Sequence, residues 1–288
     1  MKRRWTAVLL LLLAACHSSK PAPSEVPKDS PFFYPSFLPT GFKVQDGAVL
    51  TSGPQHKAFG AALGRPAGAG KFDAVVLVTA AEADGDRVVT AAEKVTSVDV
   101  GAIHARLHDD AEVGAYVDWF ANGVAVSVSG QSGTGSLLVD VARRLQGAVV
   151  DQMALPSAPD GYATITSGHF TVNTPDAGGT LLIVGPAGAS IRLTAAESTV
   201  ALVFAVAGGD HIESTTVRGH DALVSTRTRT IQGQQVTQRV MAWTERPGLT
   251  ISLTANTAAA QLVPVADGLV RITEASWRRG VPPPTSVR

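Results

Sequence analysis

The sequence has one cysteine, few charged residues and no net charge. Lys and Arg together number 24 among its 288 residues, and Asp and Glu also number 24. A neutral chain lacks the basic surface that a phosphate backbone requires, which excludes a nucleic-acid-binding protein. Because Cys16 is the only cysteine, no internal disulfide can form. The stability of the fold must therefore come from buried apolar surface.

The apolar run at the N-terminus is too short to span a membrane. Residues 5–15 are almost entirely apolar and follow basic residues at positions 2–4. A transmembrane helix needs about 20 apolar residues. A basic start followed by a short apolar stretch is instead typical of a secretion signal.

Residues 13–16, Leu-Ala-Ala-Cys, resemble the lipobox of bacterial lipoproteins. The resemblance implies a signal peptide over residues 1–16 and acyl chains, such as palmitate, attached at Cys16. It also implies a place in the bacterial cell envelope, on the extracytoplasmic side of the plasma membrane or in the outer membrane. The alternative is an ordinary signal peptide with an incidental cysteine. Residues 17–31 are rich in Ser, Pro and charge, which predicts a disordered tether.

One pattern occurs twice in the rest of the sequence. Trp243 follows Trp119 by 243 − 119 = 124 residues, and residues 262–269 repeat the Leu-Val-x-Val-Ala-x-x-Leu spacing of residues 138–145 at the same offset. Alternating apolar residues after each tryptophan also correspond. We interpret the pattern as two copies of one domain, over residues 32–148 and 149–278, followed by a disordered tail over residues 279–288.

Each copy combines strand and helix signals. Residues 115–119 and 124–129 alternate around a turn that contains Gly, which predicts a hairpin with Trp119 on its core-facing side. The apolar residues of 138–145 recur at helical spacing, and a helix is also expected over residues 258–273. The predicted fold class is therefore α+β, with two tandem repeats that are each a mainly antiparallel β-sheet covered by a C-terminal helix.

The densest aromatic cluster, residues 32–38, precedes the first copy. We expect it to pack on the domain beside its entry point, and contact with the membrane or a partner is the alternative. From Trp277 onward, paired arginines and a run of prolines favour a disordered end of the chain.

The order of elements resembles an extracytoplasmic domain of unknown function found in Gram-positive lipoproteins and anti-sigma-factor-like proteins. In that family a strand with a small residue precedes a hairpin that contains Trp and Gly, and a Leu/Ala helix follows. The resemblance implies an envelope protein with an α+β fold and no catalytic residues. A broader similarity to lipoprotein-carrier-like folds implies an apolar groove. The matching positions are Ala105, Trp119, Gly123 and residues 138–145, and again Ala222, Trp243, Gly248 and residues 262–269.

One cluster carries metal-ligand residue types. His104 and His108 share a face on a strand or a helix, which makes them candidate metal ligands. Three acidic residues follow them, Asp109, Asp110 and Glu112. The alternative is a set of polar residues where a strand enters a turn.

The glycine-rich loop 130–135 precedes a helix and has two interpretations. Its backbone N–H groups are placed as in loops that cradle an anion. It lacks the lysine of a phosphate-binding loop, which favours a plain loop. No catalytic residue is expected, because a nucleophile elbow and convincing pairs of carboxylates are missing from the sequence.

These signals favour a non-enzymatic, lipid-anchored envelope protein that binds a ligand or a partner. The expected partners are the membrane, through Cys16, and an unknown envelope protein or apolar small molecule, with no nucleic acid and no cofactor. Two alternatives stay open: a metal-dependent envelope hydrolase that uses His104 and His108, and a structural subunit of an envelope assembly. An apolar cavity between sheet and helix would favour ligand capture. A flat exposed apolar patch would favour docking of a protein.

Overall fold

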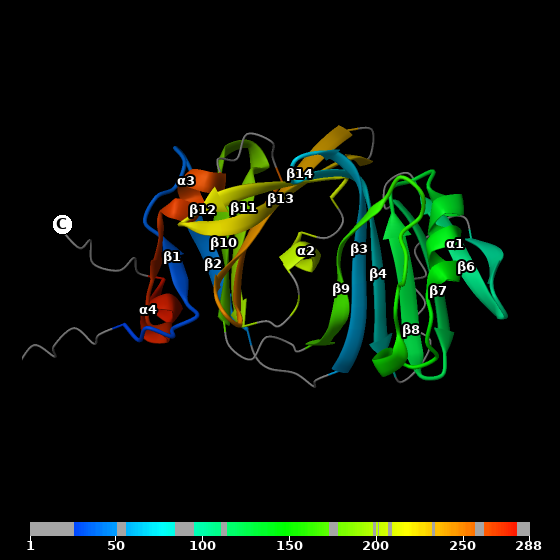
Figure 1. The fold of residues 1–288 in the computed structure, drawn as a ribbon. Helices are drawn as coiled ribbons and strands as arrows, with labels where there is room; N and C mark the ends of the chain where they lie inside the picture. Colours follow the sequence, from blue (N-terminus) through cyan, green and yellow to red (C-terminus); the bar gives the residue numbers. More distant parts are fainter. Residues whose placement is uncertain are drawn as a thin grey trace, which may run out of the picture.

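The computed structural model describes residues 26–50, 56–83, 95–110, 114–172, 178–197, 200, 202–206, 209–231, 234–256 and 262–280. Most of these residues lie in β-strands, which form two groups side by side (Figure 1). Cys16 and Glu112 lie outside the described residues, as does most of the proposed tether.

The first half of the molecule comes from one stretch of the chain, between residues 56 and 172. Its elements are β3 (His56–Gly68), β4 (Lys71–Glu82), β5 (Val95–Val100), β6 (Ile103–Asp110), β7 (Gly114–Ala121), β8 (Val124–Gly130), α1 (Gly135–Arg144), the short 3-10 helix η1 (Val150–Gln152) and β9 (Ala163–Val172).

The second half combines the beginning of the described chain with residues 178–280. Its elements are β1 (Phe33–Pro35), β2 (Lys43–Val49), β10 (Gly178–Val184), η2 (Pro186–Gly188), β11 (Ser190–Glu197), α2 (Leu202–Ala205), β12 (His211–Val217), β13 (His220–Ile231), β14 (Gln234–Arg246), β15 (Leu249–Ala255), α3 (Leu262–Asp267), β16 (Leu269–Arg271) and α4 (Glu274–Arg279).

One antiparallel sheet of 14 strands runs through both halves. The strand order is β9-β3-β4-β8-β7-β6-β5 in the first half and β2-β10-β11-β15-β14-β13-β12 in the second. Each strand of one half thus has a counterpart at the same place in the other. The halves join where β12 pairs with the start of β4, for example through Ile212 and Phe72. Ala74 then adopts a left-handed φ of 49°, and the later residues of β4 pair with β8 instead.

The α+β fold class predicted from the sequence, with two tandem repeats each covered by a C-terminal helix, is wrong. Strands dominate the described residues, and they join in one large sheet instead of forming two separate helix-covered sheets. In the described part of the range 258–273, the expected helix is present over the six residues of α3. Pro264 has no N–H for a helical hydrogen bond, and the chain leaves α3 to form β16, which pairs with β1. The helical spacing does locate α1, which packs on β7 and β8.

In each half, the outermost strand of the order given above pairs with a strand from a distant part of the sequence. β2 pairs with β10, whereas β9 pairs with β3. Each of these two strands follows a Pro-x-Gly turn with the same closing hydrogen bond, from Phe42 N to Pro39 O at 3.0 Å and from Tyr162 N to Pro159 O at 3.1 Å. Since β1 and β2 lie beside elements from residues 178–280, both ends of the described chain lie in the second half (Figure 1).

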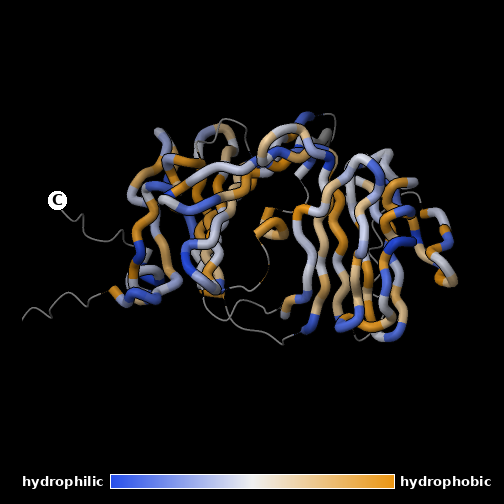
Figure 2. Tube along the Cα trace, in the orientation of Figure 1, coloured by the Kyte–Doolittle hydropathy of each residue, from blue (hydrophilic) through white to orange (hydrophobic). Residues whose placement is uncertain are grey.

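Three apolar clusters stabilise this arrangement. The first lies between α1 and the strands of the first half and contains Trp119, and the second lies in the second half and contains Trp243. The third lies at the junction, where Val203 and Val206 pack with Ile212 of β12. Figure 2 shows the apolar α2 segment between the two halves. The junction is therefore a packed core as well as a strand pairing.

The aromatic cluster packs on the second half. Phe32, Phe33 and Tyr34 are buried there, and the Phe32 ring lies 5.6 Å from the ring of Trp277, whereas Phe37 is 43% exposed. Trp277 belongs to α4, so the interpretation of the chain from Trp277 onward as disordered is wrong for α4. Ser276 N donates to the hydroxyl of Thr273 and thereby caps this helix. Residues 281–288 lie outside the described residues.

Candidate ligand-binding pocket

Trp119 and Trp243 occupy equivalent positions in the two halves. Trp119 in β7 is opposite Val126 of β8, and Trp243 in β14 is opposite Ile251 of β15. The neighbouring strand presents a small residue beside each ring, since Ala222 is paired with Trp243 and Ala105 is buried in the same core as Trp119. The surroundings of the two indoles can therefore be compared position by position.

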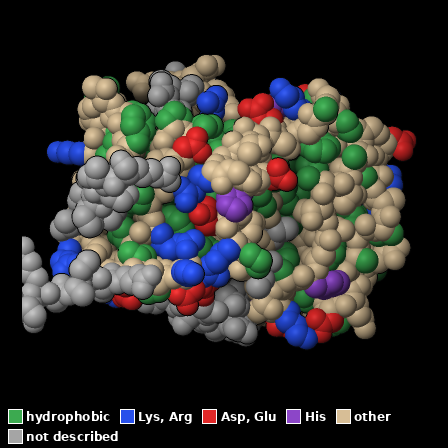
Figure 3. Space-filling model, turned by 60° about the vertical axis from the view of Figure 1, so that its left-hand side comes forward, with side chains coloured by type: hydrophobic (Ala, Val, Ile, Leu, Met, Phe, Trp, Pro, Cys, Tyr) green, Lys and Arg blue, Asp and Glu red, His purple; other side chains and the backbone are tan. Residues whose placement is uncertain are grey.

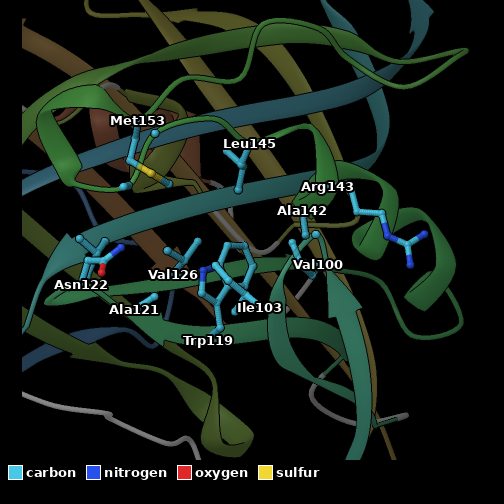
Figure 4. A pocket seen from close by; sticks show the side chains of 14 residues that line it. Val100, Ile103, Trp119, Ala121, Asn122, Val126, Ala142, Arg143, Leu145 and Met153 are labelled. Carbon is cyan, nitrogen blue, oxygen red and sulfur yellow. The ribbon is translucent and has the colours of Figure 1, made fainter.

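A cavity of about 150 Å³ opens beside Trp119, between α1 and the sheet. Figure 4 shows the Trp119 ring among side chains from β5, β6, β8 and the C-terminal end of α1. The polar side chains at its edge are Asn122 and Arg143, and the guanidinium of Arg143 points away from the indole (Figure 4). The apolar residues that line it are Val100, Ile103, Val126, Ala142, Leu145 and Met153. We call this cavity the Trp119 pocket.

The two indole N–H groups differ in their hydrogen bonding. Trp243 is fully buried, and its Nε1–H donates to Glu245 Oε2 at 2.8 Å. Trp119 is 8% exposed, and its Nε1–H has no acceptor among the described residues. An indole N–H usually has a partner when the ring is buried. The Trp119 N–H is therefore a hydrogen-bond donor without a partner in the described protein, and it is accessible to solvent.

Larger side chains fill the corresponding space in the second half. Arg218 donates from Nε and Nη2 to the two oxygens of Glu245, both at 3.0 Å, and from Nη1 to the Leu269 carbonyl at 2.6 Å. The Phe33 ring lies below two guanidinium groups, with its centroid 5.9 Å from Arg218 and 5.4 Å from Arg271. Trp243 is sealed by this set of residues.

The first half has smaller residues where the second half has this set. The β5–β6 turn between Val100 and Ile103 matches the β12–β13 turn between Val217 and His220, which puts Gly101 where the second half has Arg218. Glu245 is the extra residue of a β-bulge in β14, and the regular strand β7 has no residue at that register position; Ala121 is the residue that lies two positions after Trp119.

The strand segments beside α1 and α3 correspond in the same way. Gln146 forms a bridge with Ala154, as Val270 of β16 does with Tyr34 of β1. Met153 and Gly147 are therefore the counterparts of Phe33 and Arg271, which are paired in the second half. The pocket is thus lined by Gly101, Gly147 and Met153 at positions where the second half has Arg218, Arg271 and Phe33.

Glu245 is held in its ionised form. Its side chain is only 6% exposed, and burial alone raises the pKa of a carboxyl group. The hydrogen bonds from Arg218 and Trp243 outweigh this effect, with a further contribution from the charges of Arg218 and His220, so the pKa of Glu245 lies below its ordinary value. The charged pair is therefore part of the packed core beside Trp243.

His104 and His108, the candidate metal ligands, bind different carboxylates in the structure. The exposed His104 lies 2.7 Å from Asp99 through Nδ1. His108 is buried, stacks on Tyr116 at 4.2 Å, and places Nε2 3.1 Å from Asp118. Within the described ranges, which leave out Glu112, no three His, Cys, Asp or Glu residues are grouped to hold a metal ion.

The glycine-rich loop holds an internal carboxylate. The backbone N–H of Gly133 donates to both carboxylate oxygens of Asp109, at 3.1 and 3.2 Å, and the Ser132 hydroxyl donates to the same group at 2.9 Å. Asp109 was expected in the metal cluster and the loop at an anion site. In the structure, the loop binds the Asp109 carboxylate, so the two stabilise each other.

A wider groove of about 450 Å³ lies between β2 and α4, with Val44, Leu181 and Trp277 among its lining residues. It also reaches Gly280, the last described residue. The edge of this groove therefore coincides with the edge of the described structure. The Trp119 pocket is lined by residues of β5 to β8, α1 and the segment that follows α1.

The fold and the pocket define a two-part β-sheet protein with a small cavity whose side chains are mainly aliphatic and whose edge is polar. No protein-family model matches the sequence, and the curated proteins contain no match either. A solved structure, the apo form of the immunity protein TplEi of T6SS from Pseudomonas aeruginosa, is similar to the chain at 11% identity. The similarity covers 81% of this chain and 96% of that protein with a TM-score of 0.24, a value too low to support a conclusion about fold or function.

Basic and acidic side chains are intermixed on the face shown in Figure 3, with apolar side chains between them. In the described part of the chain, no helix has the length and apolar character needed to cross a membrane.

Proposed function

We propose that this chain is a non-enzymatic, lipid-anchored envelope protein that binds a ligand in the Trp119 pocket. The observation that supports this function is the difference between the two halves. Equivalent tryptophans lie in equivalent strands, yet only Trp243 has its N–H bonded and its surroundings filled.

The size of the pocket limits what it can hold. Cavities for drug-sized ligands measure roughly 300–1,000 Å³, so a volume of about 150 Å³ is too small for a whole molecule of that kind. An apolar cavity of about 150 Å³ can hold benzene. The pocket suits one ring-sized apolar group, either a small molecule or the part of a larger molecule that enters it.

Residues 28–30 are bonded to the second half, and this supports an orientation of the protein relative to the membrane. Ser30 donates to the Ile272 carbonyl at 2.6 Å, Arg246 donates to the Asp29 carbonyl at 2.9 Å, and Arg271 donates to the Lys28 carbonyl. An anchor at Cys16 would therefore connect to the second half. The Trp119 pocket lies in the other half, so we propose that it faces away from the lipid.

The ligand-binding proposal can be tested with a variant that copies the second half into the first. Gly101→Arg with Ala121→Glu, here called the filled variant, introduces an arginine at the counterpart of Arg218 and a carboxylate two residues after Trp119. A control variant, Val95→Glu with Ser97→Arg, adds the same charges at exposed positions of β5. All proteins are extracted from membranes, and their bound small molecules are identified by mass spectrometry.

We expect a compound that co-purifies with the wild type and the control and is lost from the filled variant. Equal amounts of every co-purifying compound in all three proteins would contradict binding in the Trp119 pocket. Circular dichroism of the filled variant checks that a loss of ligand does not reflect a loss of fold.

The lipid anchor has its own test. Intact mass spectrometry of the mature protein should show an N-terminal Cys16 that carries acyl chains, and Cys16→Ser should release the protein from the membrane fraction. An unmodified Cys16 thiol in the membrane-associated protein would contradict the lipidation proposal.

A further inference from the structure

We infer that the Trp119 pocket selects a neutral, ring-sized apolar molecule with one oxygen acceptor. This inference rests on the proposed function and adds the chemical class of the ligand. Three features of the described residues support it: the position of the unused N–H, the missing counter-charge and the apolar walls.

The oxygen acceptor follows from the comparison of the two tryptophans. In the second half, a carboxylate oxygen of Glu245 accepts the indole N–H at 2.8 Å. The hairpin of the first half lacks the bulge residue that Glu245 represents, and the methyl group of Ala121, two residues after Trp119, lines the pocket without offering an acceptor. A ligand oxygen beside the indole would accept a hydrogen bond from the Trp119 N–H.

The neutral character follows from the absence of a charged partner. The carboxylate of Glu245 is balanced by Arg218, but the residue at the equivalent place in the first half is Gly101. Arg143 is exposed, donates to the Asp99 carbonyl at 3.1 Å and points away from the indole (Figure 4). An ionised group at the Trp119 N–H would therefore lack the paired guanidinium that Glu245 has, which makes it less favourable than a neutral group.

The ring-sized apolar body follows from the walls and from the occupant of the second half. The side chains around the indole of Trp119 are mainly aliphatic. The Phe33 ring is fully buried in the core beside Trp243, and its counterpart in the first half is the slimmer Met153. A flat ring can pack against the Trp119 face at favourable distances, and it fits a volume of about 150 Å³.

The test uses the full, membrane-extracted protein with ¹⁵N-labelled tryptophan. The Trp119→Phe variant assigns the Trp119 indole signal. Three probes share one ring: benzyl alcohol is neutral with one oxygen, toluene has no oxygen, and benzoate is charged at neutral pH. Each probe is titrated into the wild type, the filled variant and the control variant.

We expect benzyl alcohol to shift the Trp119 indole signal saturably in the wild type and the control, and to leave it unchanged in the filled variant. Toluene should bind about fivefold more weakly, because it cannot accept the N–H. Benzoate should bind at least about tenfold more weakly than benzyl alcohol, because its charge is not balanced.

Two kinds of result would overturn the inference. Toluene or benzoate that binds as tightly as benzyl alcohol would exclude selection for a neutral acceptor. If none of the probes shifts the Trp119 signal while a co-purifying compound still distinguishes the wild type from the filled variant, the ligand class is wrong and the binding function stands. If neither experiment distinguishes the two proteins, the binding function itself fails.

Discussion

Gly101 and Arg218 occupy the same position of two equivalent turns, and both have a left-handed backbone, with φ of 61° and 52°. No atom lies within 4 Å of the point where a Cβ at residue 101 would be. A Cβ at residue 101 would therefore meet no steric obstacle, and the backbone strain of a residue other than Gly would be about 1–2 kcal/mol. At this turn the two halves thus differ in side-chain size, and in the hairpin that follows they differ in the bulge at Glu245.

Removing one partner of the buried ion pair beside Trp243 should lower the free energy of unfolding more than removing both partners. Arg218→Ala leaves the buried carboxylate of Glu245 without its main partner, and we expect a loss of about 3 kcal/mol in the free energy of unfolding. The double variant Arg218→Ala, Glu245→Ala should lose less. Urea unfolding measures both, and a double variant less stable than the single one would argue against a paired, desolvated Glu245.

The same carboxylate should produce a pH dependence of stability. Its pKa is lower in the folded protein than in the unfolded chain, so its contribution is present above the ordinary Glu pKa of about 4.3 and is lost as the pH falls through the folded-state pKa. Glu245→Gln should flatten the decrease in unfolding free energy below about pH 4.3. A decrease of the same slope in the variant and the wild type would show that Glu245 is not responsible.

The two tryptophans should differ in their contribution to stability. Trp243→Ala removes a fully buried ring and its hydrogen bond, so we expect a loss of about 5 kcal/mol. Trp119→Ala enlarges a cavity that already exists and should lose about 3 kcal/mol. Denaturant unfolding compares the variants directly. A larger loss for Trp119 would mean that the first-half site is the better packed one.

The position of Phe33 makes the second half depend on the start of the described chain. Phe33 is fully buried among residues of that half, and Phe33→Ala should destabilise it by about 3–5 kcal/mol. The indole signal of Trp243 should move in this variant and that of Trp119 should stay. Phe37→Ala, at a 43% exposed position, is the matched control and should move neither signal. A shift of Trp119 alone would contradict the observed strand pairing.

The sequence predicts the local elements better than the overall architecture. Alternation of apolar residues after Trp119 and Trp243 locates both hairpins, and the spacing of Leu138, Val141 and Leu145 locates α1. The pairing of β2 with β10 and of β9 with β3 produces no local pattern in the sequence, because it joins residues that are far apart in the chain. For this reason the single 14-stranded sheet was not predicted.

The difference between the two hairpins is visible in the sequence as a difference in spacing of one residue, and the structure explains it. The two tryptophans are 124 residues apart, but the residues after the turn, Val126 and Ile251, are 251 − 126 = 125 apart. The extra residue belongs to a β-bulge between Thr244 and Arg246, at Glu245. A bulge redirects a side chain, and here it accompanies the carboxylate that meets the Trp243 N–H. No rule of spacing shows that the smaller residues of the other hairpin leave a cavity.

The most direct test of the central claim is hydrogen exchange at the two indole N–H groups. The signals of Trp119 and Trp243 are assigned with Trp→Phe variants in the membrane-extracted protein, and their exchange with deuterium is followed in the absence of added ligand. The Trp119 N–H should exchange faster than that of Trp243, and the filled variant should slow the exchange at Trp119 towards that of Trp243. Equal rates in the wild type, with no change in the filled variant, would contradict an open Trp119 pocket.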